Sequence, residues 1–104
     1  MEKALAYLVE SADKAAKARA ERLYLDEYTK HLAAKLMCEV LERSPGLAVS
    51  AQERDARAMG AYRTHLEGLR AAIEADEGYR YRREAEAAVI EAYRTYSANT
   101  RAVR

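Results

Sequence analysis

Apolar residues recur three or four positions apart through most of the first 43 residues, which predicts one helix over about 2–43. Neither proline nor glycine interrupts this stretch. The expected stripe has two parts, first Leu5, Leu8, Ala12 and Ala15, then Leu25, Tyr28, Leu32, Leu36 and Val40. Between Ala12 and Arg22 stand only alanines and charged residues, so the pattern leaves open whether this part packs or stays exposed. A helix of about 40 residues is a rod of roughly 60 Å that needs a packing partner.

The segment 44–50 contains the only proline, directly followed by a glycine, and predicts the end of the first helix. Ser50 and Glu53 match the S-x-x-E pattern of a capping box. In this motif the serine hydroxyl accepts a hydrogen bond from a backbone N–H of the first helical turn, and the glutamate side chain reaches back to the serine backbone N–H. We therefore expect a short helix over about 51–58. Gly60 predicts a stop or kink after Met59, because glycine is unfavourable inside a helix.

Beyond Gly60 the helical spacing resumes and predicts a third helix over about 61–97, with a frayed tail at 98–104. Its expected stripe is Tyr62, Leu66, Leu69 and Ile73, followed after a slip by Tyr81, Ala85, Ala88, Ala92 and Tyr96. Gly68 and Gly78 lie inside the pattern without a proline or turn cluster, so they favour bending over a break.

Two long helices joined by a short connection predict an all-α fold, a long, coiled-coil-like antiparallel hairpin with a short third helix at the connection. The chain of 104 residues is expected to form a single domain, 1–104. If Arg43 faces about Tyr62 across the hairpin, His31 lies opposite about residue 74. His65 would then be more than about 10 Å away along the helix axis.

The composition indicates a thin core. Half of the residues are hydrophobic, but 23 of these are alanine, and the chain has no Phe or Trp. A single hairpin with so few large side chains would be marginally stable, so we expect a homodimer or higher oligomer that associates through the hairpin. The scarcity of glycine and proline excludes a turn-rich β-sandwich or barrel. The net charge of +1 excludes a uniformly basic DNA-coating protein.

Cys38 is the only cysteine, which rules out an intramolecular disulfide and favours a reducing, cytoplasmic location. Its neighbours in the sequence KLMCEVL are largely apolar, so we expect a buried structural cysteine. The N-terminal residues have neither the apolar core of a signal peptide nor the length of a membrane span. We expect no membrane association.

The sequence offers no catalytic, metal or cofactor site. His31 and His65 each lack a second His or Cys three or four residues away, the spacing that presents two metal ligands from one helix face. The four glycines form no phosphate-binding motif. The carboxylates alternate with basic residues, as on solvated helix faces. We expect no enzymatic activity and no cofactor.

One cluster rises above this background, in the last third of the chain. From Tyr79 onward there are six arginines against three glutamates, interleaved with tyrosines. Arg and Tyr dominate protein interfaces, and they also serve in phosphate contact and base stacking. A solvated face with ion pairs such as Arg80–Glu84 and Arg82–Glu86 is the structural alternative. The candidate interaction surface comprises Tyr79, Arg80, Arg82, Arg83, Tyr93 and Arg94.

Two segments, Tyr24 to Leu32 followed by Leu36-Met37 and Ile90 to Thr95 followed by Asn99 and Arg101, carry a resemblance over about residues 7–101. With Gln52-Glu53-Arg54 and Tyr62 to Leu69 between them, they resemble a family of short, uncharacterised all-helical proteins encoded by bacteriophages and prophages of Gram-negative bacteria. That family often has Trp at the position of Tyr93 and proline near Gly60. The resemblance implies phage origin, among genes of DNA recombination or replication, and brings no catalytic residues.

Together these observations predict a non-enzymatic phage or prophage accessory protein that binds a protein partner in phage or host DNA metabolism. One alternative is an inhibitor of a host defence or nuclease complex. A second alternative is a nucleic-acid-binding accessory protein that uses the Tyr/Arg-rich segment 79–104.

Overall fold

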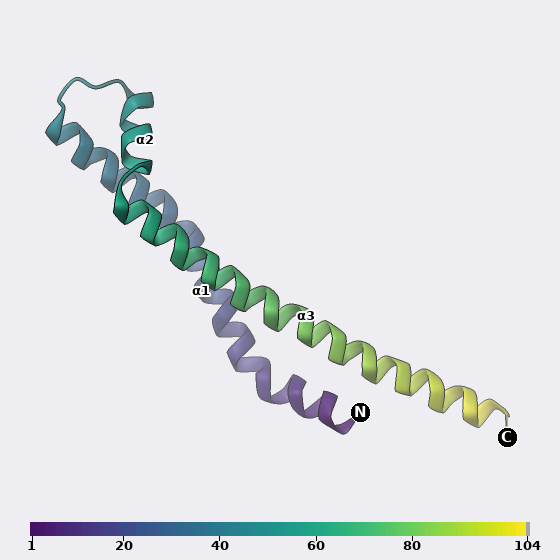
Figure 1. The fold of residues 1–104 in the computed structure, drawn as a ribbon. Coiled ribbons are helices and arrows are strands. Elements are labelled where there is room, and N and C mark those ends of the chain that lie inside the picture. The colour runs from purple at the N-terminus through teal and green to yellow at the C-terminus, as the bar shows by residue number, and fades with distance from the viewer. Residues whose placement is uncertain (104) are drawn as a thin grey trace. The chain divides into compact units, whose positions relative to one another are not determined.

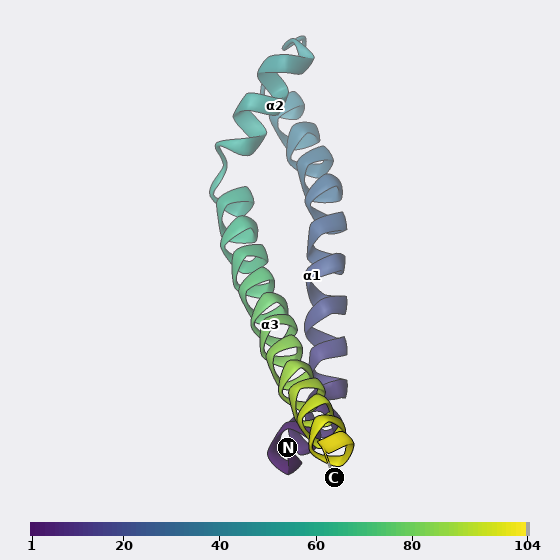
Figure 2. The ribbon, with the colours of Figure 1, turned by 90° about the vertical axis from the view of Figure 1, so that its right-hand side faces the viewer.

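The computed structural model describes residues 1–103 and contains three helices in this range, α1 (Glu2–Arg43), α2 (Val49–Arg57) and α3 (Gly60–Val103) (Figure 1). No strand occurs among these residues. Contacts divide the chain into two compact units, unit 1 with residues 1–19 and 74–104, and unit 2 with residues 20–73. Within each unit a stretch of α1 runs antiparallel beside a stretch of α3 (Figure 2). The predicted all-α helical hairpin is therefore confirmed, while the single-domain organisation stays a prediction.

The helix boundaries follow the local signals, with two corrections. α1 ends at Arg43 and α2 stops before Gly60, as predicted. The predicted end of the third helix near residue 97 is wrong, because α3 continues to Val103, and Arg104 lies outside the described residues. The helix formers of this segment propagate the hydrogen-bonded turns without interruption, because no proline stands there to end them.

The predicted capping box is also wrong. α2 begins at Val49, its N-cap is Ala48, and no side chain caps it. Ser50 is therefore already inside the helix, where its hydroxyl is too far along the first turn to act as the cap. Gln52 takes over the anchoring role, because its Nε2 donates to the Leu47 carbonyl oxygen at 2.7 Å.

The turn after α1 accounts for the Pro-Gly pair. The Leu47 amide donates to the Ser44 carbonyl at 3.3 Å, which closes a four-residue turn with Pro45 second and Gly46 third. Gly46 has a φ of 87°, in the left-handed region that a β-turn of type II requires at its third position. Proline presets φ at the second position, so both residues match the geometry of the turn.

Unit 2 contains the main hydrophobic cluster. Leu32, Leu36 and Val40 of α1 are buried together with Ala56 of α2. Five partly buried side chains pack around them, Tyr28, Met37, Leu47, Met59 and Tyr62. The second half of the predicted α1 stripe is therefore the core side of the helix. No large side chain among the described residues is completely buried, as expected for a chain rich in alanine.

The predicted register in unit 2 is wrong. Thr29 of α1, not a residue near 40, lies opposite His65, and their side chains are 2.7 Å apart. The rings of His31 and His65 both contact Tyr28, each with its centroid 5.4 Å from the Tyr28 centroid. The register differs because α2 lies against the end of α1. Ala56 of α2 packs beside Leu36 and Val40, where the start of α3 was expected.

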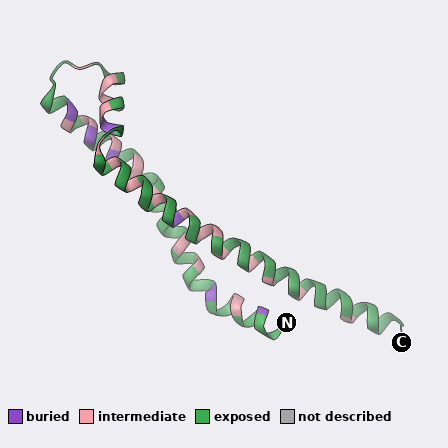
Figure 3. Ribbon diagram, in the orientation of Figure 1, coloured by how far each residue is buried: buried purple, intermediate pink, exposed green. Residues whose placement is uncertain are grey.

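In unit 1 the buried stripe of α1 lies one residue away from the predicted one. Ala4 and Ser11 are buried, whereas Leu5 and Ala12 are exposed (Figure 3). Leu8 and Ala15 are half-buried as the pattern suggested, and so is Ala18 in the alanine-rich part. Leu8 is thus accompanied on the inward side mainly by small side chains, whereas Leu5 is 45% exposed.

The second stripe predicted for α3 points away from the core. Tyr81, Ala85, Ala88, Ala92 and Tyr96 are all exposed. The half-buried residues of this part of α3 are instead Tyr79, Arg83, Glu86, Ile90 and Ser97. One helix turn covers 3.6 residues, so these two sets occupy different sides of α3. The last third of the chain therefore keeps an apolar stripe at its surface.

Cys38 is exposed, so the prediction of a buried cysteine is wrong. It stands two residues from both Leu36 and Val40, and two residues turn a helix by about 200°. Apolar neighbours in sequence therefore place Cys38 on the side opposite the core. Among the described residues, no helix combines the length and the apolar character that crossing a membrane requires.

Candidate interaction surface

Arg83 connects α3 to α1 inside unit 1. Its Nη1 donates to the Leu8 carbonyl oxygen at 2.8 Å and to the Ser11 Oγ at 2.6 Å. Ser11 is 4% exposed, so its hydroxyl is shielded from water at this contact. Arg83 is one of the predicted binding residues, but its guanidinium forms hydrogen bonds between the two helices of the hairpin. Its polar contacts add to the apolar packing between the two helices, in which few large side chains take part.

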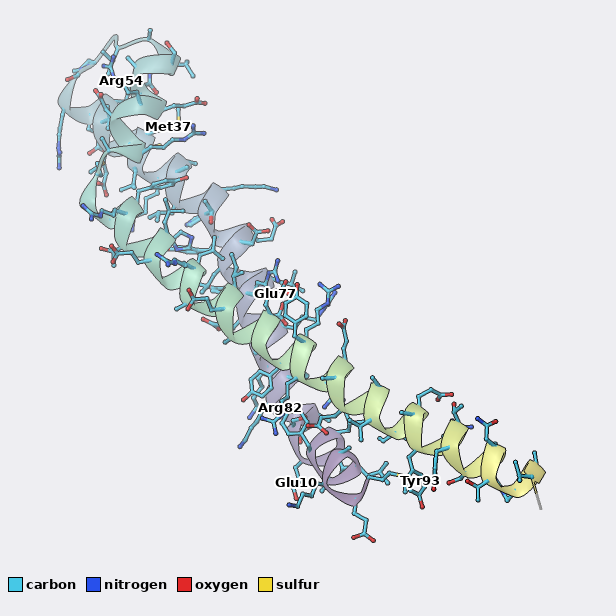
Figure 4. The ribbon with its side chains drawn as sticks, turned by 45° about the vertical axis from the view of Figure 1, so that its right-hand side comes forward. Glu10, Met37, Arg54, Glu77, Arg82 and Tyr93 are labelled. Atoms are coloured by element: carbon cyan, nitrogen blue, oxygen red, sulfur yellow. The ribbon has the colours of Figure 1, made fainter. Side chains whose placement is uncertain are left out.

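Arg82 is the second arginine that reaches α1. Its Cζ lies 4.4 Å from the centroid of the Tyr7 ring, a cation–π contact, and its Nε lies 3.4 Å from the Glu86 Oε1. Figure 4 shows Arg82 on the side of α3 that approaches the N-terminal turns of α1. Arg82 and Arg83 therefore both contact α1.

Arg82 and Tyr7 form part of a shallow groove of about 280 Å³ in unit 1. The groove is lined by Tyr7, Glu74, Ala75, Gly78, Tyr79 and Arg82. Gly78 has no side chain to fill the groove, and a Cβ built on it meets nothing within 4 Å. Two tyrosines, one arginine and a glycine thus surround a hollow that is open to solvent. We name this the Tyr7–Arg82 groove.

Arg80 and Arg94 form ion pairs along the exposed surface of α3. Arg80 lies 3.3 Å from Glu84 and 3.8 Å from Glu77, and Arg94 lies 3.6 Å from Glu91. The hydrogen bond to Glu84 and the charges of Glu77 and Glu84 raise the pKa of Arg80 above its ordinary value. The expected i, i+4 pairs Arg80–Glu84 and Arg82–Glu86 are thus both present. Exposed pairs of this kind stabilise a helix only slightly.

Tyr93 lies apart from the groove residues. It is 51% exposed and lines a surface hollow together with Met1, Glu2 and Lys3. Figure 4 shows Tyr93 nearer than Arg82 to the C-terminal end of α3. The six candidate residues therefore do not form one patch. Tyr79 and Arg82 line the groove, Arg83 joins the helices, and Arg80 pairs with glutamates. Tyr93 and Arg94 line a second surface hollow, together with Met1 and Glu91.

The residues that sequence reasoning missed come from α1. Tyr7, Leu8 and Ser11 supply the ring, the carbonyl and the hydroxyl that the arginines of α3 contact. Tyr7 and Ser11 are four residues apart and therefore lie on the same side of α1, and this is the only sequence signal they carry. A serine on that side looks like a solvated residue until the arginine opposite is known.

The histidines of unit 2 form a small polar and aromatic cluster. Thr29 Oγ1 donates to the Leu25 carbonyl oxygen at 3.0 Å, so its lone pairs accept the proton of His65 Nε2. Tyr28 contacts the rings of both His31 and His65. In residues 1–103 no group of three or more His, Cys, Asp or Glu side chains is arranged to hold a metal ion.

Comparison with known proteins identifies no relative of this chain. No protein-family model, no curated protein and no solved structure matches the chain.

Proposed function

We propose that this chain is a non-enzymatic interaction protein that binds another protein through the Tyr7–Arg82 groove. The groove carries the proposal, because it combines a hollow of about 280 Å³ with the Tyr and Arg side chains that contribute most to binding at protein interfaces. Arg82 is held in place by the Tyr7 ring and by Glu86, so little side-chain freedom would be lost on binding.

The proposed setting is a bacteriophage or prophage, in the cytoplasm of the bacterial host, with a partner that acts in DNA recombination or replication. Only the resemblance of the segments around Tyr24 to Leu32 and Ile90 to Thr95 supports this setting. Neighbouring genes are an association and do not supply a mechanism.

The arginine contacts favour a protein partner over nucleic acid. Arg80, Arg82 and Arg94 each pair with a glutamate, and Arg83 is bonded to Leu8 and Ser11. Phosphate binding would have to replace these contacts, and the glutamates would oppose it. The excess of arginine over glutamate in residues 79–104 therefore attracts phosphate less strongly than the number of arginines suggests.

The test compares two glycine substitutions in α3. Gly78→Gln places a side chain in the Tyr7–Arg82 groove, whereas Gly68→Gln adds the same side chain ten residues earlier, where a Cβ also meets nothing within 4 Å. Tagged wild-type protein and both variants are used to capture proteins from infected host cells. We expect the wild type and Gly68→Gln to retain the same partner and Gly78→Gln to lose it.

Two results would contradict the proposal. Equal capture by both variants would show that the groove is not the binding site. Tight, salt-sensitive binding of the wild type to a random oligonucleotide at physiological ionic strength would favour the nucleic-acid alternative instead.

A further inference from the structure

The C-terminal part of α3 has an exposed face without charge. Six exposed residues follow one another at spacings of four and three, namely Ala85, Val89, Ala92, Tyr96, Asn99 and Val103. We call these residues the uncharged face of α3. The exposed fractions of Val89, Tyr96 and Val103 are 47%, 70% and 88%. Alternating spacings of four and three residues are the pattern by which one helix packs along another.

The charges of the same segment lie on the other side of the helix. Between residues 85 and 103 the charged side chains are Glu86, Glu91, Arg94 and Arg101. At 100° per residue they gather around the direction opposite to the uncharged face. Glu91, Arg94 and Arg101 are exposed as well, so water reaches both sides of this segment. The uncharged face is the side that a partner can cover without burying a charge.

The chain exposes more surface than a typical monomer of its mass, by an amount that a stable interface could cover. The accessible surface is 7923 Å² for a mass of 11.7 kDa. A folded monomer of this mass typically exposes about 5,900 Å², so roughly 2,000 Å² of surface is in excess. A standard interface covers about 800 Å² on each partner, and obligate homodimers cover more. The excess is thus of the size that a homodimer removes from water.

We propose that the uncharged face of α3 packs against the same face of a second copy of this chain in an antiparallel, two-fold symmetric dimer. Two-fold pairing brings a face onto itself, so a face without charge meets no like charge. The spacing of the six residues is symmetric about residue 94. A two-fold axis there brings Ala85 opposite Val103, Val89 opposite Asn99, and Ala92 opposite Tyr96 of the other copy.

These pairs complement each other in size. Ala85 and Ala92 each meet a larger side chain, Val103 and Tyr96, which lets the two helices approach closely without a cavity. A parallel arrangement would place Ala92 on Ala92 and Tyr96 on Tyr96, and would alternate gaps with crowded layers. The antiparallel pairing is independent of the Tyr7–Arg82 groove, which lies N-terminal to the uncharged face on α3.

The first test measures molar mass by sedimentation equilibrium. We expect the wild type at twice 11.7 kDa and Ala92→Lys as a monomer at the same concentration, because the pairing would bury the new ammonium group. The control is Ala71→Lys, which alters an exposed alanine of α3 at the same heptad position three heptads earlier. It should remain a dimer. Circular dichroism of both variants checks that the helices are retained.

A monomeric wild type, a dimeric Ala92→Lys protein with retained helices, or equal loss of the dimer in both variants would overturn the proposal.

The second test determines the orientation by disulfide formation. Two proteins are made in a Cys38→Ser background, one with Ala85→Cys and one with Val103→Cys. In the antiparallel dimer residue 85 meets residue 103, so covalent dimers should form on oxidation only when the two proteins are mixed. Covalent dimers of either protein alone would overturn the antiparallel pairing.

Discussion

The Oγ of Ser11 lies 2.6 Å from Nη1 of Arg83, although 72 residues separate them in sequence. The same nitrogen donates to the carbonyl oxygen of Leu8. A buried hydroxyl and a half-buried arginine thus supplement the apolar packing where α1 presents mostly small side chains, such as Ala4 and Ala15, beside Leu8. This contact joins the buried side of α1 to the half-buried side of α3 in unit 1.

Arg83→Met should destabilise the fold by about 1–3 kcal/mol, because it removes both hydrogen bonds and leaves the Ser11 hydroxyl buried without that partner. Urea unfolding measures the change. The control is Arg94→Met, which removes one exposed ion pair and should cost less than about 1 kcal/mol. The double variant Arg83→Met with Ser11→Ala should lose less than the sum of the two single losses, and full additivity would show that the contact contributes nothing.

The Thr29–His65 contact predicts the tautomer of the neutral histidine. Thr29 donates its hydroxyl proton to Leu25, so His65 must donate from Nε2. Nitrogen-15 NMR of the imidazole should show Nε2 protonated and Nδ1 free of a proton. Thr29→Val should cost about 1 kcal/mol and shift the His65 nitrogen signals while leaving those of His31 largely unchanged. Protonation at Nδ1 in the wild type would contradict the assigned roles.

Two glycines should respond to alanine in opposite directions. Gly46 has a φ of 87°, which a side chain strains, so Gly46→Ala should destabilise the fold by about 1 kcal/mol. Gly68 lies in α3 with open space at the Cβ position, so Gly68→Ala should stabilise it by about 0.5–1 kcal/mol. Thermal and urea unfolding of the two variants measure both signs. Stabilisation by Gly46→Ala would show that the turn differs from the one described.

Cys38 should behave as a surface thiol. We expect native protein to react completely with a thiol reagent without prior unfolding, because the residue is exposed on the side of α1 opposite Leu36 and Val40. Cys38→Ser should change the free energy of unfolding by less than about 0.5 kcal/mol. Reaction limited by unfolding, or a large loss on substitution, would instead show that Cys38 is covered.

Local sequence properties determined the helices and their connections. The absence of proline and glycine before Ser44 sets the length of α1, Pro45 and Gly46 set the turn, and α3 begins at Gly60 after a short break. The stripe from Leu32 to Val40 also identified the core of unit 2, because leucine and valine on one side leave no competing choice. These features depend on residues within one or two helix turns of each other.

Only the tertiary structure decided which side of an alanine-rich helix faces inward. The segments around Ala4 to Ala18 and Ala85 to Val103 present more than one nearly apolar side, so burial of apolar area differs little between orientations. Contacts distant in sequence then make the choice. Arg83, which bonds Ser11, lies with Tyr79 and Ile90 on the side of α3 opposite the exposed stripe of Tyr81 to Tyr96. In unit 2, Ala56 of α2 packs beside Leu36 and Val40 near the end of α1, and His65 lies beside Thr29.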